Sequence, residues 1–405
     1  MHIRLLIAAA CLLGLFSTIG ASLPYPILPP LFASGASNGL NTFLGLPPKL
    51  LFGLALMINP LGLLIGSALM GPLSDRYGRR PVLLVTALGA ALGHIITALA
   101  LVIESYPLFI AARLFTGLLE GNGAVARALL ADRLEGALRV RAMSWLNGAF
   151  YLGWLAGPLL AGATVVLGLT VPFWIAAVAL VGAALLVAVA LPREAPSLAT
   201  TSWWQVARNG HALNLLRHTE LRMLFIVQLA FTCGVTAFYE FYPLWLVEVA
   251  GYGARGIAWL TAAMCALMTL TSLYAGGPST QAPLRRASWY ALACAGAIAL
   301  VGLGNVWIAL AAIVLFGVPN ALYNATVPAW CAERFGALGQ GAVMGLLSTT
   351  FCLANILMAL AGSVLTLVDT RLILLLGAAF TAWSAWRLQG WRAQMAGVAP
   401  VHPAR

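Results

Sequence analysis

Three ionisable side chains lie inside long apolar stretches of this sequence, where chemistry is the usual reason to keep a charge. Arg113 and Glu120 share one stretch, and Glu240 lies in another. A charge at the centre of a bilayer costs about 2.5–3.5 kcal/mol on insertion scales, so such residues are functional candidates. A carboxylic acid in an apolar site holds its proton more tightly than in water, and a nearby arginine opposes this effect. Glu120 and Glu240 are therefore candidate proton carriers, with Arg113 adjusting the equilibrium or binding an anionic group. The alternative is a static buried ion pair that fixes helix packing.

The spacing around Arg113 predicts where its partners are. Arg113, Glu120 and Arg127 recur every seven residues, so on one continuous helix they point roughly the same way. Seven residues rise about 10.5 Å, whereas partners on one helix sit three or four residues apart. Arg113 and Glu120 therefore need partners on other helices or in water. Gly117 and Gly121 share the face of Arg113 and would let another backbone approach.

Further polar side chains are placed to line a path or a cavity. One apolar stretch carries polar residues at every fourth position, which would form a stripe on one face of a helix. This stripe is expected to face water or a second bundle, and it consists of Gln228, Thr232, Thr236 and Glu240. Pro243 follows and could kink that helix. His94 is expected to be a packing residue, with a proton role as the alternative. The candidate residues for lining a substrate cavity, about half of them expected to be packing contacts, are Asn147, Tyr151, Trp154, Tyr239, Asn320, Tyr323 and Asn324.

The composition shows which elements must position these residues. The chain has 405 residues, 62% hydrophobic and 8% charged, with a mean hydropathy of +0.95; soluble proteins average about 25% charged. A water-soluble fold is excluded. A bilayer core of about 30 Å needs about 20 apolar residues per helix. We predict twelve transmembrane helices, near 5–31, 50–71, 81–102, 107–130, 142–167, 170–191, 221–248, 256–276, 287–304, 306–331, 339–366 and 370–389.

The basic residues predict the orientation. Of the 22 lysines and arginines, 18 fall on one side of the predicted membrane, three on the other, and Arg113 within a segment. By the positive-inside rule both termini are cytoplasmic, in a multi-pass protein of the cell inner membrane. Because these charges are spread over every inner loop, no nucleic acid partner is expected. The six cysteines follow no metal spacing and no phosphate-binding loop is present, so we expect no metal and no cofactor.

The only long polar stretch divides the chain into halves of six segments each. We predict an N-terminal six-helix bundle over 1–191, a cytoplasmic linker over 192–220 that could form an interfacial helix, a C-terminal bundle over 221–391, and a short tail over 392–405. Weak matches at an offset near 200, such as Leu160-Ala161-Gly162 with Leu360-Ala361-Gly362, indicate an internal repeat. The expected fold class is an all-α membrane protein with two pseudo-symmetric bundles.

A motif between the second and third predicted helices resembles a known family. Residues 71–81 read Gly-Pro-Leu-Ser-Asp-Arg-Tyr-Gly-Arg-Arg-Pro, in which glycines let a short loop turn and helices approach. The pattern is similar to the GxLxDRxGRR signature of the major facilitator superfamily, in the loop where that family carries it. The resemblance implies an inner gate, for which the candidate residues are Gly71, Asp75, Arg76, Gly78, Arg79, Arg80 and Asp132.

Two further signatures agree with this resemblance. Arg113-Leu-Phe-Thr-Gly117 resembles the family's arginine motif. A helix-packing motif typical of its drug:proton antiporters is represented by Gly153, Gly157, Pro158 and Gly162. Departures are present too, since Gln281 stands where Asp75 maps in the second half and the first predicted helix has no acid.

The resemblance implies a secondary transporter rather than an enzyme. We expect a monomeric, proton-coupled exporter of a small amphipathic drug, siderophore or metabolite, working by alternating access between two bundles around a central cavity. Its partners would be a small-molecule substrate, protons and the lipid bilayer. The alternatives are a proton-coupled importer or facilitator of a small organic solute, or more remotely a membrane sensor.

Overall fold

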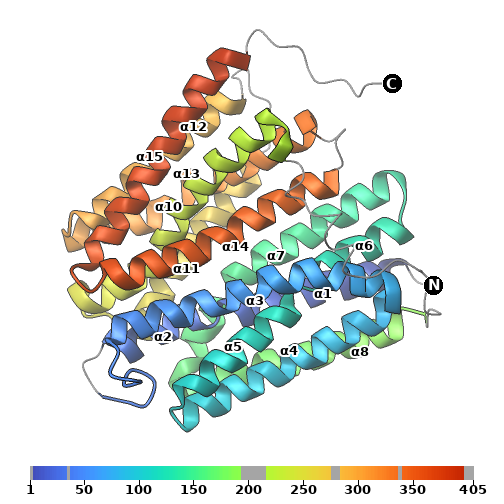
Figure 1. Ribbon diagram of the computed structural model, residues 1–405, viewed down its shortest axis with the longest axis horizontal. Helices are drawn as coiled ribbons and strands as arrows, with labels where there is room; N and C mark the ends of the chain where they lie inside the picture. The colour runs from blue at the N-terminus through green and yellow to red at the C-terminus, as the bar shows by residue number, and fades with distance from the viewer. Residues whose placement is uncertain (1–2, 34–36, 193–215, 275–282, 336–339, 396–405) are drawn as a thin grey trace. The chain divides into compact units, whose positions relative to one another are not determined.

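The protein is all-helical in the residues that the structure describes. A computed structural model describes residues 3–33, 37–192, 216–274, 283–335 and 340–395, and no strand is present in those ranges. Each predicted segment coincides with one helix or with two consecutive helices (Figure 1). The helices of the first half are α1 (Ile3–Ser22), α2 (Pro24–Ala33), α3 (Pro48–Tyr77), α4 (Arg79–Val102), α5 (Tyr106–Glu120), α6 (Gly123–Arg133), α7 (Gly136–Thr164) and α8 (Val171–Ala190), with a 3₁₀ turn η1 (Val165–Leu167). Those of the second half are α10 (Thr219–Ala250), α11 (Ala254–Tyr274), α12 (Pro283–Gly302), α13 (Val306–Phe335), α14 (Gln340–Leu365) and α15 (Thr370–Met395).

The helices are long and apolar because a bilayer leaves backbone groups no water to bond, and a helix satisfies them internally. Nine described helical stretches are long and apolar enough to cross a membrane. The exposed face of α4 is apolar, as expected for a helix in contact with lipid. Its exposed side chains at helical spacing include Val85, Leu88, Leu92 and Leu99. The opposite face of α4 is buried and includes His94. The chain is therefore an all-α, multi-pass membrane protein.

Two predicted segments are each broken into two helices. The first breaks at Leu23 because Pro24 and Pro26 cannot donate backbone hydrogen bonds. The fourth ends α5 at Glu120 and restarts as α6 at Gly123. The prediction of one continuous helix carrying Arg113, Glu120 and Arg127 was therefore wrong beyond Glu120.

The chain divides into two compact units. The first contains α1–α8, and the second contains α10 and α12–α15 with all of α11 except its first five residues. Most of the predicted linker over 192–220 and of the tail over 392–405 lies outside the described residues. The domain boundaries therefore stay predictions.

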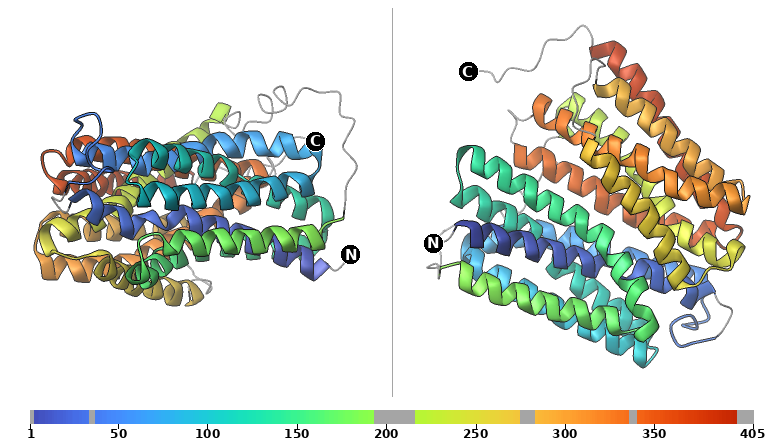
Figure 2. Two further views of the ribbon diagram at one scale, coloured as in Figure 1. Left: turned by 90° about the horizontal axis from the view of Figure 1, so that it is seen from below. Right: turned by 180° about the vertical axis from the view of Figure 1, so that it is seen from behind.

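Small residues bring pairs of helices together within the first unit. A Cβ added at Gly117 of α5 would lie 2.2 Å from the Asn59 carbonyl oxygen of α3, and one added at Gly66 of α3 would lie 2.0 Å from the Leu118 carbonyl oxygen. The predicted close approach at Gly117 is thus present, and α3 is the partner. In the same way Gly157 of α7 packs against α1. Figure 2 shows these helices from two further directions.

In the second unit α10 packs against α14 and α15. Its buried aromatic side chains include Phe238, which lies 4.2 Å from the Phe316 ring of α13 between ring centroids. The backbones of α10 and α15 approach closely, since a Cβ at Gly234 would lie 2.4 Å from the Gly377 carbonyl oxygen.

Candidate functional site

Arg113 binds the broken end of α1. Its side chain is 2% exposed, and it donates from Nη2 to the Ala21 carbonyl at 2.9 Å and from Nη1 to the Gly20 carbonyl at 3.4 Å. In a continuous helix the Gly20 carbonyl would accept from the backbone N–H of residue 24, but Pro24 has none. A cation is also favourable at a helix C-terminus. Arg113 therefore supplies donors that the proline removes.

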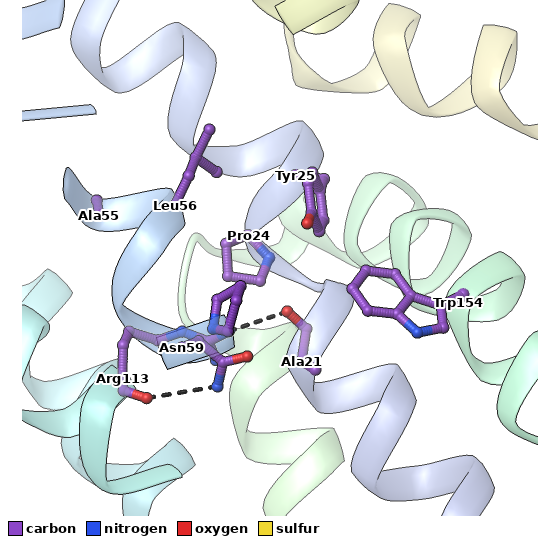
Figure 3. Close-up of a pocket in the computed structure, with 9 residues that line it drawn as sticks. Ala21, Pro24, Tyr25, Ala55, Leu56, Asn59, Arg113 and Trp154 are labelled. Atoms are coloured by element: carbon purple, nitrogen blue, oxygen red, sulfur yellow. Dashed lines mark hydrogen bonds between the residues drawn. The ribbon is translucent and has the colours of Figure 1, made fainter. Parts of the chain in front are cut away.

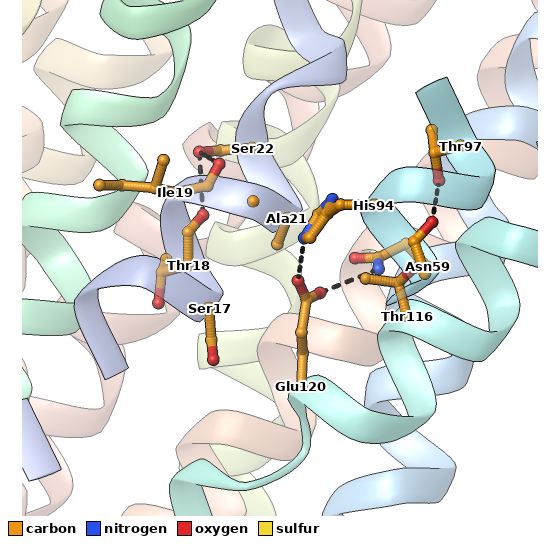
Figure 4. Close-up of polar contacts among 12 residues, drawn as sticks. Ser17, Thr18, Ile19, Ala21, Ser22, Asn59, His94, Thr97, Thr116 and Glu120 are labelled. Carbon is orange, nitrogen blue, oxygen red and sulfur yellow. Dashed lines mark hydrogen bonds and ion pairs between the residues drawn. The ribbon is translucent and has the colours of Figure 1, made fainter. Parts of the chain in front are cut away.

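Glu120 is held by two other helices. His94 Nε2 of α4 lies 3.1 Å from Glu120 Oε1, and Asn59 Nδ2 of α3 donates to Glu120 Oε2 at 3.1 Å (Figure 4). The His94 and Glu120 side chains are 0% and 3% exposed. Arg113 and Glu120 thus find separate partners on other helices, as their seven-residue spacing predicts.

Gly20 is the point at which these side chains meet α1. A Cβ at this position would lie 2.2 Å from His94 Nε2 and 3.2 Å from Glu120 Oε1. Only glycine leaves room for the His94 ring here. Arg113, Glu120 and His94 come from two helices and converge on one turn of a third.

A pocket opens beside Arg113 in the first unit. Its cavity volume is about 20 Å³, little more than one water molecule occupies. Tyr25 and Trp154 face each other edge to face at 5.7 Å between ring centroids on one side (Figure 3). Its lining residues are Ala21, Pro24, Tyr25, Ala55, Leu56, Asn59, Pro60, Arg113 and Trp154. Of the predicted cavity residues in the first unit, Trp154 lines this pocket, Asn147 lies half-buried on α7, and the Tyr151 side chain lies outside the described residues.

Sequence reasoning missed part of this site. Asn59 is the polar residue that joins the pocket to Glu120, and a lone asparagine in an apolar run was the available signal. Asn122, at the break between α5 and α6, donates to Ser17 Oγ at 3.3 Å. His94 contacts Glu120 as well as packing at 6.3 Å from the Phe173 ring between centroids.

Glu240 is placed differently from Glu120. It lies on α10 with a 1% exposed side chain, and neither of its carboxyl oxygens has a hydrogen-bond partner among the described residues. Along the same stripe, Gln228 accepts from Tyr323 of α13 at 3.0 Å and donates to Thr232 at 3.3 Å. Gln228 and Thr232 therefore have hydrogen-bond partners within the second unit, whereas the carboxyl oxygens of Glu240 have none among the described residues.

The predicted cavity residues of the second unit form two groups. Asn320 Nδ2 of α13 donates to the Tyr239 hydroxyl at 3.0 Å, and Asn324 Nδ2 donates to Asn320 Oδ1 at 3.0 Å. Tyr323 is instead a core residue that stacks on Phe231 at 3.5 Å between ring centroids. The structure brings Tyr239, Asn320 and Asn324 together.

The charged motif between α3 and α4 forms a network. Arg79 Nη1 lies 2.5 Å from Asp75 Oδ1, and Arg79 Nε donates to Asp132 Oδ2 of α6 at 3.0 Å. Arg79 also bonds Ser74. Both carboxylates are half exposed, so each pair alone contributes little to stability, and the network joins the ends of three helices.

The other members of the motif have separate contacts. Arg80 donates to the Ala188 carbonyl of α8 at 2.8 Å, and the Arg76 guanidinium lies 5.5 Å from the Tyr77 ring centroid. The predicted loop is reduced to Gly78, whose φ of 91° favours glycine. Gly71 lies inside α3, and no atom of the described residues lies within 4 Å of a Cβ added there. Helical hydrogen bonding continues into the charged residues, past the end of the apolar run.

The glycines of the predicted packing motif lie on α7. A Cβ at Gly153 would lie 2.7 Å from the Leu15 carbonyl oxygen of α1, and one at Gly157 would lie 2.8 Å from the Ile19 carbonyl oxygen. Pro158 and Gly162 follow, both buried in the same helix. This contact fixes α1 against α7 next to the Arg113 site.

The apolar helices, the close contacts between their small residues and the buried charged side chains together are the features of a membrane transporter fold. The sequence profile of the Major Facilitator Superfamily matches residues 10–359. The chain belongs to the Major Facilitator Superfamily. In the described residues no cluster of three His, Cys, Asp or Glu side chains could hold a metal ion.

Named relatives are similar to part of the chain. The class B tetracycline resistance protein of Escherichia coli is 32% identical over 169 residues, which are 42% of this chain and 39% of that protein. The class C protein of the same organism is 36% identical over 127 residues, 31% of each chain. The chain thus spans less than half the length of these relatives. The solved structure of the human organic anion transporter MFSD10 matches with a TM-score of 0.71 at 21% identity, over 96% of this chain and 100% of that one, and shows the fold.

Proposed function

We propose that this protein exports a small amphipathic compound, such as a drug, siderophore or metabolite, in exchange for protons by alternating access. The proposal is supported by family membership, by the names of the tetracycline resistance relatives, and by the Gly153 and Gly157 contact between α7 and α1, whose motif is typical of drug:proton antiporters. In this proposal the protein is a monomer in the inner membrane with both termini in the cytoplasm.

The observation that carries proton coupling is the pair of buried acids. Glu120 in the first unit and Glu240 in the second are at most 6% exposed on membrane-spanning helices. An ionised carboxylate without partners is costly in an apolar interior, and binding a proton removes that cost. This argument applies to Glu240, which has no hydrogen-bond partner among the described residues, whereas Glu120 would exchange a proton together with His94, its partner at 3.1 Å.

The substrate side of the proposal rests on the pocket beside Arg113. Tyr25 and Trp154 offer flat apolar surfaces, while Asn59 and Arg113 offer hydrogen-bond donors. Such a lining suits a molecule with a planar apolar body and a polar edge, which would enter once the pocket widens in another state of the alternating-access cycle. In the second unit, Tyr239 and Asn320 present a similar combination.

We further propose that the Asp75–Arg79–Asp132 network is an inner gate. It joins neighbouring ends of α3, α4 and α6, which this proposal places on the cytoplasmic side, so its formation and loss would accompany movement of those ends. The gate would let the pocket open to one side of the membrane at a time.

The test uses purified protein in liposomes with an imposed pH gradient. Tetracycline and a panel of other amphipathic compounds are screened for accumulation, first with the native protein and then with Glu120→Gln and Glu240→Gln. Glu135→Gln, at an exposed position before α7, is the matched control. Gradient-driven accumulation that is lost in at least one buried variant and kept in the control supports the proposal. Accumulation retained by both buried variants would show that neither acid couples. Accumulation on the alkaline side, in the same direction as the proton flow, would indicate a proton-coupled importer.

A further inference from the structure

We infer that the proton-binding site of the first unit is the His94–Glu120 pair, with the incoming proton taken at His94 Nδ1. This inference rests on the proposed function and assigns the proton to a residue pair on two helices. The sequence patterns favoured Glu120 alone and a packing role for His94.

The hydrogen bonds around Glu120 show where an added proton can enter the pair. Both of its oxygens are engaged, Oε1 with His94 Nε2 and Oε2 with the Asn59 amide, which can only donate from Nδ2. When Nε2 carries the hydrogen toward Glu120, Nδ1 is left with a free lone pair. His94 Nδ1 is buried and has no hydrogen-bond partner among the described residues. It is therefore the free basic position of the pair.

The groups around the pair determine how its charge is balanced. Among the described residues His94 pairs with Glu120 of α5, and Arg113 of the same helix interacts electrostatically with Glu120 and with Tyr25 of α2. The other elements packed against the pair contribute uncharged groups, namely Gly20 of α1, Asn59 of α3 and Phe173 of α8. With one shared proton the pair carries one negative charge, which balances Arg113. A second proton at Nδ1 leaves the three groups with one net positive charge.

Asn59 connects this pair to the pocket. Its side chain lines the pocket beside Arg113 and donates to Glu120 Oε2 at 3.1 Å. A solute that brings positive charge close to Asn59 would disfavour the extra proton on the His94–Glu120 pair by electrostatic repulsion. Proton and substrate would then exclude each other, which is the condition for antiport.

Nitrogen NMR of the full chain in lipid nanodiscs tests the inference without any substrate. The chain has five histidines, so a sample with ¹⁵N-labelled histidine gives few ring signals, and His94→Gln identifies those of His94. His218→Gln, at an exposed position before α10, is the matched control. We expect the His94 ring to gain a proton when the sample is acidified and to stay neutral under the same conditions in Glu120→Gln. A His94 ring that keeps one protonation state in the native protein, or that titrates identically in Glu120→Gln, would overturn the inference.

Transport by His94→Gln gives a second readout. Glutamine keeps a donor near Nε2 for Glu120 but cannot take a proton, so the variant retains the contact without the charge change. With tetracycline as the probe in liposomes, we expect gradient-driven accumulation to fall at least tenfold while exchange at equal pH continues. Full gradient-driven accumulation by His94→Gln would refute the inference. If the native protein moves none of the compounds screened, the proposed function fails, and the NMR result still decides whether the pair binds a proton.

Discussion

Gly20 is the residue whose replacement most directly tests the convergence of His94, Glu120 and Arg113 on α1. In Gly20→Ala the new Cβ would lie 2.2 Å from His94 Nε2, 2.6 Å from His94 Cε1 and 3.2 Å from Glu120 Oε1. The ring is fully buried and cannot swing into open space, so the ring or the α1 backbone must shift. Overpacking of this kind costs about 1–3 kcal/mol, and we expect a lower melting temperature in detergent.

Two comparisons make this prediction specific. Gly182→Ala is the matched control, because Gly182 is exposed in α8 with nothing within 4 Å of an added Cβ, and it should be neutral or stabilising by up to about 1 kcal/mol. Gly20→Ala combined with His94→Ala should recover part of the loss, since residues in contact couple by about 0.5–3 kcal/mol. If Gly20→Ala melts with the native protein, or if the double variant shows additive losses, the site geometry described above is wrong.

Three other perturbations test separate parts of the structure. Arg113→Met should destabilise the native chain by about 1–3 kcal/mol because it leaves buried carbonyls without donors, and less in a Pro24→Ala background, where residue 24 regains its N–H; equal losses in thermal unfolding would argue against the capping role. Asp75→Asn should lower transport while leaving the amount of protein in the membrane unchanged, as measured by flux and immunoblot, and normal flux would count against the gate. Gly66→Ala should lower the melting temperature relative to Gly182→Ala, because its Cβ would lie 2.0 Å from the Leu118 carbonyl oxygen, and equal melting temperatures would contradict close packing of α3 on α5.

Sequence reasoning reached the fold because membrane helices follow from local composition. Apolar length locates each segment whatever its neighbours are, and the Arg113 motif and Gly117 predict a close contact without naming α3 as the partner. It failed where hydrogen bonding depends on particular backbone donors. Pro24 broke the first segment, and helical bonding continued through Asp75 and reduced the predicted loop to Gly78.

The polar contacts of the site were harder to predict. His94 and Glu120 meet because of the rotation of α4 against α5, and that rotation is set by packing contacts such as Gly93 on Thr116. A histidine at an apolar position has the same local signature whether it packs or pairs. Asn59 is equally ambiguous, because a single amide in an apolar helix shows no partner until its neighbours are placed.

The central claim is that buried acids exchange protons for substrate, and the most direct measurement is of proton movement itself. Liposomes containing the protein and an internal pH indicator are given an outward gradient of a compound that the protein transports, with equal pH on both sides. The proposed exchange predicts that the interior becomes more acidic as the compound leaves. It also predicts that the double variant carrying Glu120→Gln and Glu240→Gln shows no such acidification. Movement of the compound with no change of internal pH in the native protein would contradict it.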